Sequence, residues 1–130
     1  MILLDTNSLI WQTIQPEKLS SAARSAIAAS NDAGEIISIS IMSLWEIALL
    51  VSRGRLVLHV PIERFFDAIE ANFRVIPVTR AIATHAADIP PPFPKDPMDR
   101  LIAATALTEN LTLITADRSI LASNACKLLW

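Results

Sequence analysis

Short apolar runs alternate along the chain with longer segments whose apolar positions have helical spacing. The runs are only a few residues long and are rich in Ile, Leu and Val, which is typical of strands buried on both faces. They predict strands over residues 1–4, 35–40, 74–78, 111–116 and 126–130. The first strand is followed directly by an acidic residue, Asp5.

The segments between these runs have the apolar spacing of amphipathic helices. Gly34 is a normal stop signal for one helix, and Thr79 is a normal cap for another. We predict helices up to about Ile14, over 16–33, over 43–52, over 61–73, from Thr79 to about Ala87, over 98–109, and a short one after Asp117. Residues 52–58 are expected to form a turn followed by a short extended piece.

This alternation of strands and helices predicts an α/β fold, with a parallel sheet covered by helices on both faces. The length of 130 residues fits one domain, and no linker or repeat divides the chain. In such sheets the crossovers are right-handed, and ligands bind outside the carboxyl ends of the strands. Chemistry is therefore expected at the edge where strands end and helices begin.

Composition narrows the class of protein further. The chain is 52% hydrophobic with only two glycines, which excludes disordered and linker-rich proteins. A net charge of -2 gives no global sign of nucleic-acid binding, and the single Cys126 favours a reducing cytoplasm. The first residues contain an acid before any signal-like apolar region forms, and the apolar stretch around Glu46 is too short for a membrane span. We expect a cytoplasmic protein that is not embedded in a membrane.

Four acidic residues are expected at the functional edge of the sheet. Asp5 and Asp117 each follow a predicted strand, and Glu46 and Asp99 each fall in the opening turn of a predicted helix. Four carboxylates in one cleft repel each other unless a cation lies between them. Oxygen ligands of this kind suit Mg²⁺ or Mn²⁺, and such an ion can activate a water for phosphodiester hydrolysis.

Each acid also has a purely structural explanation. Asp5 and Asp117 are good N-caps, and Ser43 with Glu46 fits the pattern of a capping box. In the segment "KDPMDR", Asp96 is a good N-cap, while Asp99 suits the positive end of a helix. The four together favour the metal site. The role of Asp96 stays open: it is either a helix cap or an outer support of that site.

The acids lie in motifs that resemble a known family. "MILLDTN" at residues 1–7, "SLWEIA" at 43–48, "KDPMDRLIAATA" at 95–106 and "LTLITAD" at 111–117 are similar to motifs of the PIN-domain ribonucleases. Within that family they resemble the VapC-type toxins of bacterial toxin–antitoxin pairs. The likeness spans the whole chain, in order and with suitable spacing.

The resemblance implies a fold, an activity and partners. It implies a three-layer sandwich with a five-stranded parallel sheet of order 3-2-1-4-5 between helices. It also implies that the four acids bind Mg²⁺ or Mn²⁺, that RNA is the substrate of an endonuclease, and that a cognate antitoxin restrains the protein. A homodimer is expected as well. The four are Asp5, Glu46, Asp99 and Asp117.

Polar and basic residues beside the acids are candidates for supporting roles. Thr6, Asn7 and Thr115 could hold a water or a carboxylate, with local turn capping as the alternative. Arg100 and Arg118 each follow a site acid directly, so they could contact RNA phosphates or lie on solvated helix faces.

Several other functions lack a residue that they need. A haloacid-dehalogenase-like phosphatase requires a second acid where Asn7 stands, and a receiver domain requires a lysine that "LITADR" does not supply. Nucleotide-binding folds need a glycine-rich loop, which two isolated glycines cannot form. The alternative that stays open is a catalytically idle PIN-like module that only binds RNA or protein.

Overall fold

The computed structural model describes all residues, 1–130, and has a five-stranded parallel sheet at its centre. The strand order is β3-β2-β1-β4-β5, which confirms the expected order 3-2-1-4-5. All four neighbouring pairs are parallel, with Leu4 opposite Ile39 in one neighbour and opposite Ile114 in the other. The strands are β1 (Ile2–Leu4), β2 (Ser38–Ser40), β3 (Arg74–Ile76), β4 (Thr112–Ile114) and β5 (Leu128–Leu129).

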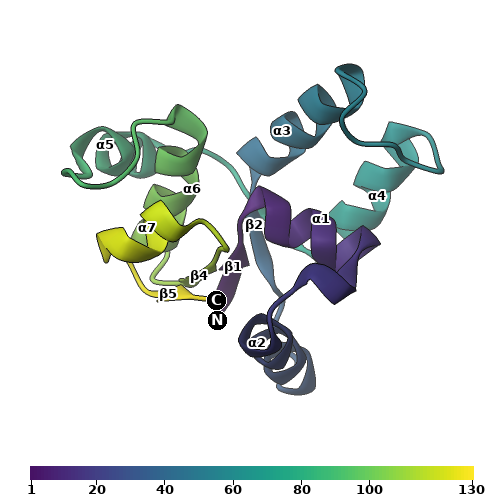
Figure 1. Cartoon of the computed structure of the whole chain (residues 1–130), viewed down its shortest axis with the longest axis horizontal. Helices are drawn as coiled ribbons and strands as arrows, with labels where there is room; N and C mark the ends of the chain where they lie inside the picture. The colour runs from purple at the N-terminus through teal and green to yellow at the C-terminus, as the bar shows by residue number, and fades with distance from the viewer.

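Helices cover both faces of this sheet, so the molecule has three layers (Figure 1). The first four helices are α1 (Thr6–Ile14), α2 (Ser21–Asp32), α3 (Ile41–Ser52) and α4 (Ile62–Asn72), with a 3₁₀ turn η1 (Pro16–Lys18) after α1. The last three are α5 (Arg80–Asp88), α6 (Pro97–Thr108) and α7 (Arg118–Ser123). None of the helices is long and apolar enough to cross a membrane.

The pleat of the strands divides the core into two clusters, one on each face. In β1, Ile2 and Leu4 join the cluster under α1 to α4, whereas Leu3 between them joins the cluster under α5 to α7. In β4, Leu113 and Ile114 divide in the same way. Side chains in a strand alternate between its faces, so a continuous apolar run is what a sheet covered on both sides requires.

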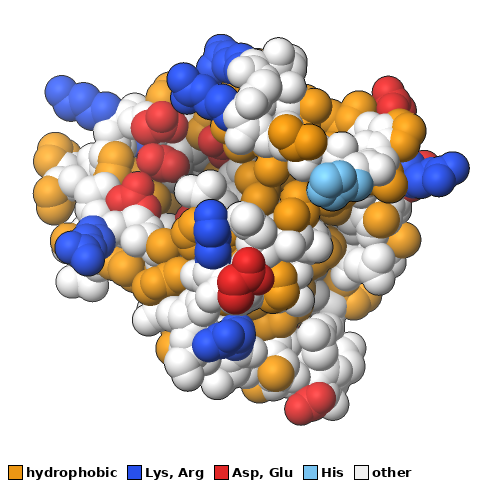
Figure 2. All heavy atoms as spheres, turned by 45° about the vertical axis from the view of Figure 1, so that its right-hand side comes forward, with side chains coloured by type: hydrophobic (Ala, Val, Ile, Leu, Met, Phe, Trp, Pro, Cys, Tyr) orange, Lys and Arg blue, Asp and Glu red, His pale blue; other side chains and the backbone are white.

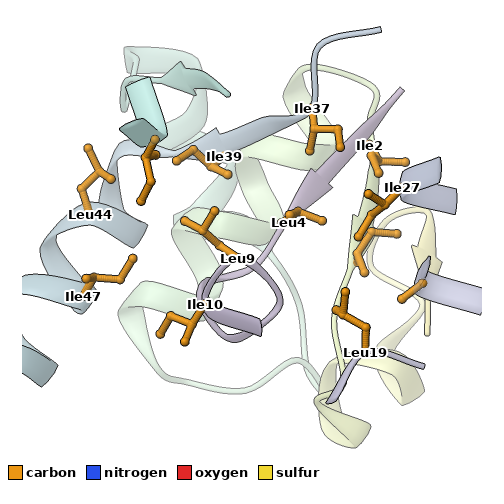
Figure 3. Close-up of a cluster of buried hydrophobic side chains, with 13 residues drawn as sticks. Ile2, Leu4, Leu9, Ile10, Leu19, Ile27, Ile37, Ile39, Leu44 and Ile47 are labelled. Carbon is orange, nitrogen blue, oxygen red and sulfur yellow. The ribbon is translucent and has the colours of Figure 1, made fainter. Parts of the chain in front are cut away.

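Figure 3 shows the first cluster, where side chains from β1 and β2 pack against the helices. Leu9 of α1 and Ile47 of α3 are fully buried there, as are Leu4 and Ile39 of the strands. Burying one such side chain contributes roughly 1.5–3 kcal/mol. This cluster therefore holds α1 and α3, which carry Thr6 and Glu46, firmly against the sheet.

Some element boundaries differ from the prediction. The predicted helix over 16–33 is broken, because Ser20 accepts a hydrogen bond from Ala23 N (3.0 Å) and starts α2 afresh after η1. Residues 52–58 contain no strand, and the strands are shorter than the apolar runs that predicted them. Some outer residues of those runs are apolar because they pack in the core without joining a strand: Ile37 and Leu111 are buried, and the partly buried Trp130 packs against Trp11 (ring centroids 5.5 Å apart).

Candidate active site

A pocket of about 170 Å³ lies at the edge of the sheet where the strands end. All four acids that the sequence predicted for the site line it. The full lining is Asp5, Thr6, Asn7, Glu46, Leu50, Asp99, Ile102, Ala116 and Asp117. Figure 2 shows acidic side chains gathered on the upper left of the molecule, with Lys and Arg side chains around them. The topology thus brings four segments that are distant in sequence into one place.

Asp5 is held by the end of β1 and the start of α1. Its main-chain N–H donates to Ile114 O (3.1 Å), and its Oδ1 accepts from Ser8 N (2.8 Å), so it is the N-cap of α1. Burial raises the pKa of its carboxyl above the usual value, although hydrogen bonds from Thr115 and Ser8 partly offset this effect. The cap interpretation is therefore confirmed, and it does not conflict with a place in the pocket.

Glu46 lies deeper in its helix than the sequence predicted. The N-cap of α3 is Ser40, whose hydroxyl accepts from Met42 N (3.1 Å), so Glu46 is in the second turn and Ser43 forms no capping box. Instead, Thr6 Oγ1 donates to Glu46 Oε1 (2.5 Å). Burial first, and then the charges of Asp96 and Asp5, raise the pKa of Glu46. Both the prediction of an opening-turn position and the capping-box alternative were wrong.

The start of α6 carries Asp96 and Asp99 in different roles. Asp96 Oδ1 accepts from Met98 N (2.8 Å) and Asp99 N (3.1 Å), so the cap interpretation of Asp96 is confirmed. The half-buried carboxyl of Asp99 has no hydrogen-bond donor in the protein. Burial raises its pKa to about 7, together with the charges of Asp96, Asp117, Glu46 and Asp5. Every acid of the pocket therefore acts on Asp99.

Asp117 completes the pocket from the turn after β4. It is the N-cap of α7, and its Oδ1 accepts from Ser119 N (2.9 Å), Ile120 N (3.2 Å) and the Ser119 hydroxyl (2.5 Å). These bonds, chiefly that from the Ser119 hydroxyl, lower the pKa of Asp117, so this carboxylate stays ionised. The buried Thr115 accepts from Asp117 N (3.1 Å) and also bonds Asp5, so it links the two acids.

The chemistry of these side chains fits a divalent cation such as Mg²⁺ or Mn²⁺. The pocket offers only oxygen donors, with no His or Cys among its lining residues. As the side chains stand, no three acidic, His or Cys groups form an arrangement that could hold an ion. A cation between them would relieve the repulsion that acts on Asp99.

Three further predicted residues, Asn7, Arg100 and Arg118, lie in different surroundings. Asn7 is exposed at the pocket, and Arg118 is exposed at the start of α7. Arg100 differs from both alternatives considered for it, since its guanidinium donates to main-chain carbonyl groups of Ala86 and Ile89 (2.9 and 2.8 Å). We therefore assign Arg100 a structural role.

Two hydroxyl groups at the site were not predicted. Ser43 is fully buried, and its Oγ lies 3.0 Å from Thr6 Oγ1. Because Thr6 donates its only proton to Glu46, Ser43 must donate to Thr6, and the three form a chain. The spacing of Ser43 and Glu46, three residues apart in a helix, does indicate that they share a face. The bond from Ser119 to Asp117 follows from ordinary helix capping.

The chain is similar to known proteins both in sequence and in fold. Residues 2–125 match the PIN domain. Ribonuclease VapC22 of Mycobacterium tuberculosis is 32% identical over 119 residues, which is 92% of this chain and 88% of that protein. VapBC2 from Rickettsia felis, bound to a DNA fragment from their promoter, has a TM-score of 0.75 at 18% identity and covers 100% of this chain and 99% of its own.

A toxin–antitoxin complex from Klebsiella pneumoniae is also similar in structure, with a TM-score of 0.68 at 20% identity, over 100% of this chain and 97% of that one. At these identities the solved structures bear on the fold alone, and they agree with the order of the sheet and with its two helical layers. The matches confirm the resemblance that the motifs suggested. This chain belongs to the PIN-domain family, where a VapC ribonuclease is among its relatives.

Proposed function

We propose that this protein is a metal-dependent endoribonuclease and the toxin of a bacterial toxin–antitoxin pair. The observation that carries the metal site is the Asp99 carboxyl, which is half-buried, has no hydrogen-bond donor and is surrounded by four other acids. A group in that position is costly to ionise unless a cation accompanies it. The relationship to a VapC ribonuclease supports RNA as the substrate.

In this proposal Asp5, Glu46, Asp99 and Asp117 hold Mg²⁺ or Mn²⁺. When bound, the ion supplies a Lewis acid that makes a water molecule a stronger nucleophile at neutral pH. The ionised Asp117 and the carboxylate of Asp5 are oriented by hydrogen bonds that leave oxygen lone pairs free for the ion.

The neutral side chains keep the acids in place. Thr6 donates to Glu46 and thereby orients its carboxylate, while the Ser43 hydroxyl donates a hydrogen bond to the Thr6 oxygen. The Thr115 hydroxyl bonds the Asp5 carboxyl and accepts from the main-chain N–H of Asp117, and Asn7 offers an amide to a water or to the RNA. In this proposal Arg118, which is exposed beside Asp117, contacts an RNA phosphate. Asp96 fixes the start of α6 and adds negative charge.

The same proposal includes a cognate antitoxin and a homodimer in the cytoplasm. The toxin–antitoxin complex from Klebsiella pneumoniae and VapBC2 share the fold, which makes an antitoxin a reasonable partner. Ile41 and Trp45 lie one turn apart on α3 and are 38% and 51% exposed, so this helix offers an apolar surface to a second protein chain.

Cleavage of a short RNA by the purified protein tests the enzymatic part. We expect cleavage with Mg²⁺ or Mn²⁺, none with EDTA, and loss of cleavage in Asp5→Asn, which keeps the N-cap but removes a charge. The matched control is Asp67→Asn, on the exposed side of α4, which should cleave like the wild type. Full activity in chelator with metals verified absent would contradict the mechanism. A folded wild type that binds but never cleaves RNA would favour the idle binding module.

A further inference from the structure

Helix α5 ends without the usual main-chain cap. Its last turn leaves carbonyl groups unpaired, and its C-cap residue, Ile89, provides no hydrogen bond to them. The next three residues are Pro90, Pro91 and Pro92, which have no N–H to donate. The first N–H after them, that of Phe93, bonds to Pro90 O (3.3 Å). A protein donor for the carbonyls of α5 therefore comes from another element.

Arg100 of α6 supplies these donors. Its Nε donates to Ala86 O (2.9 Å), and its Nη2 donates to Ile89 O (2.8 Å) and Ala87 O (3.3 Å). A longer contact joins Nη1 to Pro94 O (3.4 Å). One guanidinium thus joins the end of α5, the proline loop over 89–96 and the start of α6. A cation at the C-terminal end of a helix is also favoured by the helix dipole.

The residue directly before Arg100 is Asp99, the central acid of the pocket. The start of α6 is thus held from two sides, by the Asp96 cap on the N–H groups of Met98 and Asp99 and by Arg100 on the preceding loop. We propose that Arg100 is a positioning residue, which sets the place of the Asp99 carboxylate by fixing the proline loop to α6. The catalytic consequence rests on the function proposed above.

Charge alone does not explain the position of Arg100. The ion pairs of the protein are Met1 with Glu35 and Arg74 with Glu109, so Arg100 forms none. Its contribution comes from the geometry of a planar fork that reaches several carbonyl groups together, which a lysine cannot reproduce. Arg100→Lys therefore keeps the charge while removing most of these hydrogen bonds.

The first test uses the wild-type chain and the NMR signal of the Arg100 Nε–H group. We expect this proton to exchange slowly at neutral pH, because it is bonded to Ala86 O, and to stay unshifted when an RNA oligonucleotide is added in EDTA. The signal of the exposed Arg118 is the comparison, since it should exchange rapidly or shift with RNA. A rapidly exchanging Arg100 Nε–H, or one that shifts strongly with RNA, would overturn the proposal.

The second test compares Arg100→Lys with Arg118→Lys as a matched control. In Arg100→Lys without metal, amide exchange at Met98 and Asp99 should become about tenfold faster or more, because the helix start opens locally. With Mn²⁺, kcat should fall about tenfold to a hundredfold while KM stays within about twofold, because a displaced Asp99 affects the chemical step. Arg118→Lys should leave the amide exchange unchanged.

The outcomes separate the proposal from its rivals. If Arg100 bound an RNA phosphate instead, Arg100→Lys would raise KM and reduce the salt dependence of binding, with normal amide exchange. Unchanged exchange and unchanged kcat in Arg100→Lys would contradict a positioning role outright. If the wild type does not cleave RNA, the proposed function fails, and the exchange at Met98 and Asp99 still decides whether Arg100 holds the start of α6.

Discussion

At the scale of single residues, an acid at a helix start serves the fold and the pocket together. Asp5 and Asp117 each use Oδ1 to cap a helix, and both line the pocket. A carboxylate has about four acceptor positions, so a cap leaves some of them free for another ligand. The structural and chemical explanations that the sequence left open for these two residues are therefore compatible.

The sequence identified the acids but not the contacts that orient them. Asp5, Asp99 and Asp117 could be placed because a strand end or a helix start precedes each of them in the chain. Thr6 bonds both Ser43 and Glu46, which lie 37 and 40 positions after it in the chain. Such a contact depends on how α1 and α3 pack, which local sequence patterns do not encode.

The repulsion acting on Asp99 leads to a prediction about stability. Without metal, the pKa of Asp99 is raised from 3.8 to about 7, so the folded state binds this proton more tightly than the unfolded state. The resulting stability is fully present below the unfolded pKa and is lost as pH rises through about 7. The melting temperature of the metal-free wild type should therefore fall between about pH 5 and about pH 8.

Asp99→Asn is the matched variant for this measurement. At about pH 8 the variant should melt at the same temperature as the wild type or higher, because one repelling charge is gone. Its melting temperature should also fall less than that of the wild type as the pH rises. RNA cleavage should drop by orders of magnitude. A variant that is active but markedly less stable would show that Asp99 serves the fold and not the chemistry.

At the scale of elements, the start of helix α6 has a capping residue, Asp96, and a pocket residue, Asp99, within one short motif. In "KDPMDR" the cap is Asp96, and Pro97 occupies the first helical position, as the sequence predicted. Other boundaries were harder to predict. Helix α3 starts at Ile41, two residues before the predicted start at Ser43. The reason is that Ser40 is both the last residue of β2 and the N-cap of α3.

Substitutions at Asp96 should change the helix start without removing the site. Asp96→Ala should lower the free energy of unfolding by about 0.5–2 kcal/mol, since Met98 N and Asp99 N lose their acceptor. Asp96→Asn keeps a good cap and should be nearly silent in stability. Denaturant unfolding of both variants checks this, with RNA cleavage as the second readout. A stable but inactive Asp96→Asn would mean that this acid belongs to the metal site.

At the scale of the whole molecule, the parallel sheet brings the four acids of the pocket together. Strands β1 and β4 lie side by side and end in Asp5 and in the turn before Asp117, while α3 and α6 bring Glu46 and Asp99 to the same edge. The alternation of apolar runs and helices sufficed to predict this arrangement in outline. The break between η1 and α2 and the true strand lengths depend on tertiary packing, so they were not predicted.

The proposed role as a toxin predicts a phenotype in cells. Expression of the wild type without an antitoxin should stop growth, whereas Asp5→Asn should relieve the arrest without unfolding, because an Asn keeps the cap of α1. Growth curves, with soluble protein quantified in parallel, provide the measurement. An Asp5→Asn variant that is equally toxic while soluble would show that the site is wrongly assigned.

The central claim is that Asp5, Glu46, Asp99 and Asp117 hold one metal site, and a crystal grown with Mn²⁺ tests it most directly. Anomalous scattering locates manganese without reference to activity. We predict an anomalous peak within the pocket, coordinated by oxygen atoms of these carboxylates at roughly the short distances usual for small divalent ions, and no such peak in Asp99→Asn. A wild-type crystal with saturating Mn²⁺ and no peak in this pocket would contradict the account.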